Sequence, residues 1–188
     1  MKKEEIDGFI EDRFKGIVKY LRKVLVDFEP ENICLFRNEI EKLQVFLHLL
    51  CMESADGCSY RITKRMKTIY GYFGIFQNLQ QQLRKTNEFL KKYPGRIPVQ
   101  YVAMLEKEQE FWKKTSKDFI DADYDFFIDK KEILTTLPDK LTKKSILKFI
   151  HYTLFELQSM SCNSNGIYSL KVRGKIMGRY LFINYRIL

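Results

Sequence analysis

Apolar residues recur every three or four positions along most of the chain, which is the spacing of one face of an α-helix. The segment 31–50, ENICLFRNEIEKLQVFLHLL, shows this pattern most clearly. Its predicted core positions are Ile33, Phe36, Ile40, Leu43, Leu47 and Leu50. A second stripe beside them consists of polar, ionisable and thiol side chains, which are Cys34, Arg37, Glu41, Gln44 and His48. The segment therefore predicts a helix with a buried seam and a chemically distinct flank.

The same periodicity predicts helices on both sides of this segment. One helix runs from about Glu4 to Phe28, and Pro30 ends it because proline lacks a backbone donor. A longer helix runs from about Tyr60 to Lys92, in which two glycines, Gly71 and Gly74, favour a kink or a break.

The second half of the chain is predicted to be helical as well. The breakers in residues 93–98 mark a linker at the midpoint, and Pro98 suits the first turn of the next helix. Thr142 is a candidate N-cap of a helix that continues to about Leu157, and a last helix covers 167–188. Since no strand pattern is present, the predicted fold class is all-α.

Composition narrows the class of protein. The chain has 188 residues with 45% hydrophobic and 30% charged residues, which is typical of a globular domain. Its four cysteines form no CxxC pair, its N-terminus lacks the apolar run of a signal peptide, and no stretch is long and apolar enough to span a membrane. We therefore expect a reduced, cytoplasmic protein without a membrane partner.

Metal and cofactor sites are not expected. The two histidines, His48 and His151, lie far apart in the sequence and in apolar helical surroundings. The acidic run Asp121, Asp123 and Asp125 has the spacing of a calcium loop but lacks the glycine that such a loop needs. The sequence also shows no nucleophile with a paired base and no glycine-rich phosphate loop, so we expect a binding protein rather than an enzyme.

Positive charge is concentrated in two segments. The formal net charge is +9, and residues 57–87 and 157–188 contain no acidic residue at all. If these segments adjoin, their fields add and form an anion-binding face. The alternative of two unrelated basic faces stays open.

Three segments resemble the CHAD family, the conserved-histidine α-helical domains. Residues 31–50 resemble the first signature, with Glu31, Ile33, Arg37, Lys42 and Leu43 at matching positions. In that first signature, Glu41 stands at a basic position and Gln44 at a later arginine. In GIFQNLQ, Gly74 and Gln80 match the second signature, whereas Gln77 and Asn78 replace its charged pair. In IYSLKVRGKIMGRY, Lys171 stands for the signature arginine, Lys175 matches, and Arg179-Tyr180 comes one residue late. Both signature histidines are replaced, by Cys34 and by Tyr168.

The resemblance covers nearly the whole chain and implies a single domain, 1–188, made of two pseudo-repeated helical bundles. Their predicted limits are about 1–93 and about 98–188. The family binds inorganic polyphosphate in a basic central cavity, so the resemblance implies a phosphate-rich polyanion as ligand. The residues expected to bind it are Arg37, Lys42, Arg61, Lys64, Arg65, Lys171, Arg173, Lys175 and Arg179.

The replaced histidines leave other functions open. The polyanion site is expected to be weakened, and one alternative is a CHAD-like scaffold that binds a protein partner. Nucleic acid, which is also a polyanion, is a less favoured second alternative, because few aromatic residues interleave with the basic runs.

Overall fold

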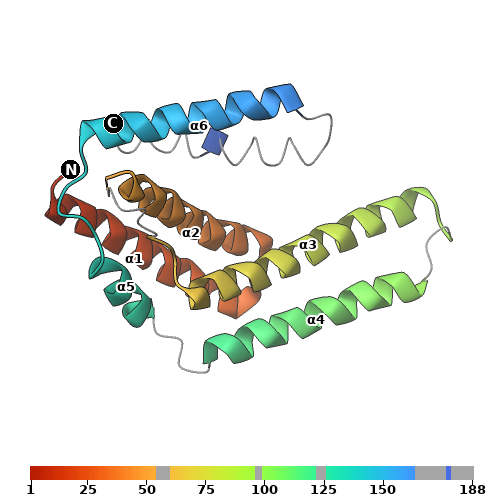
Figure 1. The fold of residues 1–188 in the computed structure, drawn as a ribbon. Helices are drawn as coiled ribbons and strands as arrows, with labels where there is room; N and C mark the ends of the chain where they lie inside the picture. Colours follow the sequence, from red (N-terminus) through yellow and green to blue (C-terminus); the bar gives the residue numbers. More distant parts are fainter. Residues whose placement is uncertain (54–59, 96–98, 122–125, 164–176, 179–188) are drawn as a thin grey trace. The chain divides into compact units, whose positions relative to one another are not determined.

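The computed structural model describes residues 1–53, 60–95, 99–121, 126–163 and 177–178, and within these ranges the protein is all-α (Figure 1). The chain runs through six helices in this part, which are α1 (Lys3–Asp27), α2 (Pro30–Cys51), α3 (Lys64–Lys92), α4 (Val99–Asp121), α5 (Phe126–Leu134) and α6 (Lys143–Asn163). The predicted fold class is thereby confirmed. None of these described helices is long and apolar enough to cross a membrane.

The chain divides into two compact units, each built from separate stretches, and α1, α2 and α5 each have residues in both units. Unit 1 consists of Met1–Arg13, Glu41–Arg61 and Glu132–Leu188, and unit 2 consists of Phe14–Ile40 and Ile62–Lys131. The predicted pseudo-repeat of two sequential halves stays a prediction.

The predicted apolar seams of the first two helices are confirmed. In α1 the predicted apolar side chains from Ile10 to Val24 are all buried, as is Phe28 just after the helix, and in α2 all the predicted core side chains from Ile33 to Leu50 are buried. Burial of this kind is the main source of helix stability in a folded protein, at about 25 cal/mol per Å² of apolar surface removed from water.

The predicted break in the third helix does not occur. α3 is one continuous helix from Lys64 to Lys92, in which Met66, Ile69, Phe73 and Phe76 are buried. Because this apolar stripe continues through both glycines, tertiary packing outweighs the loss of about 1 kcal/mol that each glycine brings to a helix interior.

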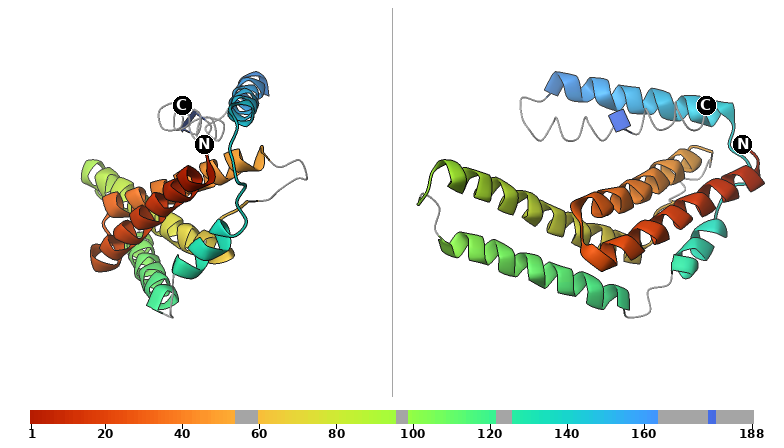
Figure 2. Two further views of the ribbon diagram at one scale, coloured as in Figure 1. Left: turned by 90° about the vertical axis from the view of Figure 1, so that its left-hand side faces the viewer. Right: turned by 180° about the vertical axis from the view of Figure 1, so that it is seen from behind.

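α3 and α4 lie side by side and antiparallel within unit 2 (Figures 1 and 2). Aromatic side chains join them, because the Tyr72 ring lies 5.3 Å from the Trp112 ring and 5.6 Å from the Phe119 ring, measured between centroids. Edge-to-face and tilted ring pairs at these distances add to the burial energy.

α1 ends three residues before Pro30, which is itself the first residue of α2. The reversal takes place at Phe28, which has a left-handed φ of 54° and whose N–H donates to Val24 O at 2.8 Å. A non-glycine residue in this conformation needs compensating contacts. They come from α3, because the Phe28 ring packs edge-on against Phe73 and Phe76 at 6.0 and 5.3 Å.

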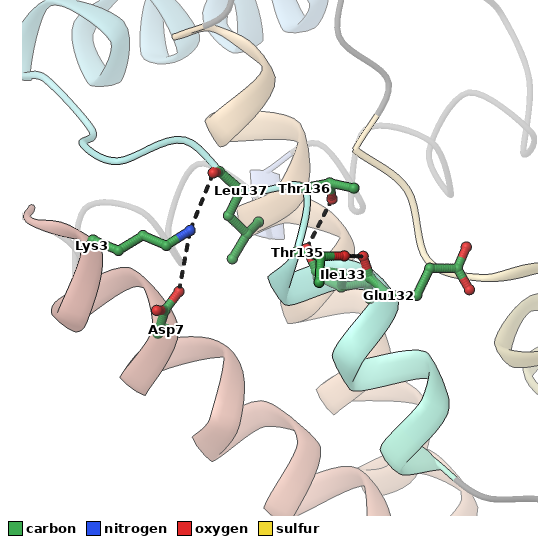
Figure 3. Close-up of polar contacts among 7 residues, drawn as sticks. All are labelled: Lys3, Asp7, Glu132, Ile133, Thr135, Thr136 and Leu137. Atoms are coloured by element: carbon green, nitrogen blue, oxygen red, sulfur yellow. Dashed lines mark hydrogen bonds and ion pairs between the residues drawn. The ribbon is translucent and has the colours of Figure 1, made fainter.

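In unit 1, the N-terminus of the chain is held by the segment that precedes α6. The Met1 ammonium donates to Leu141 O at 2.9 Å, and Lys3 Nζ donates to Leu137 O at 3.2 Å while facing Asp7 at 3.8 Å (Figure 3). The threonine hydroxyls of Thr135 and Thr136 donate to carbonyl oxygens of α5 one turn earlier (Figure 3).

The N-terminus of α6 is capped as predicted, and Glu53, two residues after the end of α2, contributes to the cap. Thr142 Oγ1 accepts from Ser145 N at 3.2 Å, and Glu53 accepts from both the N–H and the hydroxyl of Thr142, at 2.9 and 3.0 Å. Although partial burial would raise the pKa of the Glu53 carboxyl, hydrogen bonds from Thr142 and Ser145 hold that pKa below its usual value.

Candidate anion-binding site

Arg37 of α2 is held against α3 by three residues of unit 2. Its Nη1 donates to Gln77 Oε1 at 2.8 Å, and its guanidinium carbon lies 4.4 Å from the centroid of the Tyr70 ring. Gly74 leaves room for the guanidinium, since a Cβ atom there would lie only 3.2 Å from Nη1. Helix α3 is thus shaped around a half-buried cation.

The partners of Arg37 among the described residues are an amide and an aromatic ring, and both are neutral. Its Nε is buried and has no hydrogen-bond acceptor in this part of the chain. A half-buried guanidinium without a carboxylate partner in this part of the chain keeps its full positive charge, although the buried Nε itself does not reach solvent. This geometry suits the role that the sequence predicts for Arg37.

The matching positions of the second signature are also contact positions. Gly74 makes space for Arg37, and Gln80 Nε2 donates to Phe28 O at 3.1 Å, which fixes the turn between α1 and α2. Gln77 replaces a charged residue of the signature, and it accepts the hydrogen bond from Arg37. Asn78, the other replacement, is exposed.

The predicted binding residues do not all fall in one unit. Arg37, Lys64 and Arg65 lie in unit 2, and both residues of α3 are exposed. Lys42, which is half-buried, and Arg61, which is exposed, lie in unit 1. The remaining four are outside the described residues: Lys171, Arg173, Lys175 and Arg179.

Positive charge gathers on α3. This helix has seven basic residues and one acid, Glu88, whereas its neighbour α4 has four lysines and five acids. Glu88 itself faces Arg84 at 3.7 Å. The net positive charge of the α3–α4 pair therefore comes from α3.

An exposed stripe on α3, which we call the α3 face, carries part of this charge. Its members are three or four residues apart and all are exposed: Lys64, Lys67, Gly71, Ile75, Asn78, Gln82, Lys85 and Phe89. No acid belongs to it. Gly74, which accommodates Arg37, lies three residues after Gly71 and four before Asn78, so the guanidinium lies at the flank of the α3 face.

Two lysines of this face, Lys67 and Lys85, are absent from the predicted binding set. Both could have been found from the sequence, because their helical spacing from Lys64 places them on the side opposite the buried stripe of Met66, Phe73 and Phe76.

The start of α3 strengthens the field at one end of the α3 face. Thr63 is the N-cap, and its hydroxyl accepts from Met66 N at 3.2 Å. The first turn contains no acid but has two basic residues, Lys64 and Arg65. Because the N-terminal end of a helix carries a partial positive charge, helix and side chains attract anions together.

Farther along α3, an open groove of about 380 Å³ faces α4. It is lined by Gln80, Leu83, Arg84, Asn87, Glu88, Lys91 and Gln109. The groove contains an acid, Glu88, and a leucine beside its basic residues, so it differs from the basic cavity that the resemblance implies.

The histidine and cysteine side chains in the described ranges are in separate surroundings. His48 is half-buried and edge-on to the rings of Phe149 and Tyr152, at 5.2 and 6.2 Å, while His151 and Cys34 are exposed. Within the described part of the chain, no group of three or more His, Cys, Asp or Glu residues is placed to hold a metal ion. The predicted acidic run Asp121, Asp123 and Asp125 lies outside the side chains that the structure describes.

Comparisons of the chain with protein-family models, with curated proteins and with solved structures find no match. The resemblance to the CHAD family therefore stays a prediction from the sequence, and the site must be argued from its own geometry.

Proposed function

We propose that the protein binds a phosphate-rich polyanion, without catalysing a reaction, along the α3 face of unit 2. The observation that carries this proposal is the acid-free exposed stripe with three lysines, Lys64, Lys67 and Lys85, flanked by an arginine that has no carboxylate partner among the described residues. Ammonium and guanidinium groups in a row neutralise the closely spaced charges of such a polymer and release its counterions.

A linear ligand fits this arrangement better than a single small anion. Lys64 and Lys85 are separated by twenty-one residues of one helix, or about 32 Å at 1.5 Å per residue. Inorganic polyphosphate has the required repeating charge. This site is an open helical face instead of a cavity. It retains Lys64 and the flanking Arg37 from the predicted set, and Arg65 lies in the first turn of the same helix.

Polyphosphate titration at several salt concentrations tests the proposal. The double variant Lys64→Gln/Lys67→Gln is expected to bind more weakly, with a salt slope that is smaller by about 1.4, because each neutralised phosphate of a single-stranded polyanion contributes about 0.7. The matched control, Lys107→Gln/Lys114→Gln, makes the same charge change at exposed positions of α4 and should retain affinity. Equal losses in both variants would show that net charge alone, rather than the α3 face, governs binding.

The second predicted basic set calls for a separate variant. Lys171→Gln/Lys175→Gln tests whether residues 157–188 contribute, independently of α3. A loss confined to this variant would transfer the site to the C-terminal segment and contradict the assignment to the α3 face.

A further inference from the structure

The C-terminal end of the α3 face carries exposed aromatic rings next to its basic residues. Phe89 is 41% exposed and Tyr93 is 47% exposed, and their ring centroids lie 4.9 Å apart. Lys85 precedes Phe89 by one turn, and Lys92 follows it by three residues; both lysines are exposed. Aromatic and cationic groups thus alternate on one side of the helix.

Packing of α3 does not account for the outward position of Phe89. In the same part of the helix, Thr86 is buried and Leu83 and Leu90 are half-buried, so the inward side of the helix is already occupied. At 41% exposure, Phe89 leaves much of its ring in water, and a flat apolar ring beside lysines suits a ligand that has both planar bases and phosphates.

Amide side chains lie between the two groups of lysines. Asn78 and Gln82 are exposed on the α3 face, and each offers a donor and an acceptor. Phosphate oxygens can accept hydrogen bonds from these amides, so inorganic polyphosphate could use both the lysines and the amides. It has no planar rings, however, and would leave Phe89 and Tyr93 without a partner, whereas a ligand with bases can use all three kinds of group.

We infer that the ligand of the α3 face is a single-stranded nucleic acid, with its phosphates on the lysines and its bases stacked on Phe89 and Tyr93. This inference rests on the proposed polyanion binding and identifies the chemical class of the polyanion. A duplex is disfavoured because its bases are stacked inside and cannot reach exposed rings. The span from Lys64 to Phe89 is about 38 Å, which matches about eleven nucleotides at 3.4 Å per nucleotide of a stacked strand.

The test compares three probes on the full chain by fluorescence anisotropy: a dT12 oligonucleotide, a polyphosphate of similar charge and a 12-base-pair duplex. The variant Phe89→Ala/Tyr93→Ala is expected to bind dT12 about tenfold more weakly or worse, since each stacked base contributes substantially to affinity. Its affinity for polyphosphate should not change. The single variant Phe89→Tyr retains a ring at both positions, so it should bind dT12 about as tightly as the wild type does.

Phe111→Ala is the matched control, because Phe111 is an exposed phenylalanine on α4 and is 58% exposed. It should leave all three affinities unchanged. Circular dichroism of each variant establishes that the helices are retained.

The outcomes separate the two proposals. If polyphosphate binds through the lysines but dT12 does not bind, or binds equally well without the rings, the nucleic-acid inference is wrong and the polyanion proposal stands. Tighter binding of the duplex than of dT12 would also overturn the inference. If none of the three probes binds, both proposals fail, and the exposed rings are then better explained by contact with a protein partner.

Discussion

The guanidinium carbon of Arg37 lies 4.4 Å from the centre of the Tyr70 ring, at a point where α3 has a glycine instead of a side chain. Two helices of unit 2 are therefore joined through a cation–π contact and one hydrogen bond rather than through apolar packing alone. At partly buried sites a contact of this type contributes about 0.5–2 kcal/mol.

The two glycines of α3 should respond differently to alanine. Gly71→Ala adds a Cβ atom where nothing lies within 4 Å, so it should stabilise the helix by about 0.5–1 kcal/mol. Gly74→Ala brings its Cβ to 3.2 Å from Arg37 Nη1 and displaces the guanidinium, which offsets that gain. Urea unfolding of both variants measures the difference, and equal stabilisation would show that Arg37 moves away without loss.

Glu53 should make stability depend on pH in the acidic range. Because its pKa is lower in the folded state than in the unfolded state, its contribution is fully present above the unfolded value of about 4.3 and is lost as the pH falls through the lower folded value. At neutral pH, Glu53→Gln should be less stable by about 0.3–1 kcal/mol, as for a carboxylate at a helix N-terminus.

The measurement is the difference in unfolding midpoint between wild type and Glu53→Gln from pH 7 to pH 3. It should shrink as the pH falls through the acidic range. Glu106→Gln, at an exposed position of α4, is the control and should show no such trend. A difference that stays constant with pH would contradict the role of the charge.

Asp129 of α5 is a buried acid. The residue is 1% exposed, and neither carboxylate oxygen has a hydrogen-bond partner among the described residues. Replacing a buried polar group that lacks partners with an apolar side chain of similar size recovers about 1–3 kcal/mol. Asp129→Leu should therefore raise the thermal midpoint.

The control for this prediction is Asp118→Leu at an exposed position of α4, which should change stability by no more than about 0.5 kcal/mol. A lower midpoint in Asp129→Leu would mean that the carboxylate has a structural or ligand-binding role in the native state. If Asp129→Leu is more stable but binds the polyanion more weakly, the carboxylate has a ligand-binding role and no stabilising role.

The helical seams could be predicted from the sequence because each depends on local spacing. The buried faces of α1 and α2 and the N-cap Thr142 all follow from such patterns. The continuity of α3 through Gly71 and Gly74 could not, because it depends on packing against other helices rather than on helix propensity.

The candidate site was predictable only in part for the same reason. The resemblance identified Arg37 as a binding residue. It did not predict the hydrogen bond to Gln77, which is forty residues away and where the sequence shows only that a charged residue of the signature is replaced. The lysines of the α3 face could have been predicted from the sequence, because helical spacing places Lys64, Lys67 and Lys85 on one side of the helix. The exposed rings of this face could not, because exposure of Phe89 depends on which neighbours cover α3.

The turn at Phe28 has a consequence for synthesis of the chain. Its left-handed backbone is unfavourable for phenylalanine, and the contacts that compensate come from Phe73, Phe76 and Gln80. During translation, α1 and α2 emerge long before these residues do. We therefore expect the reversal between the first two helices to become stable during translation only after Gln80 has left the exit tunnel, with apolar side chains of nascent unit 2 exposed until then.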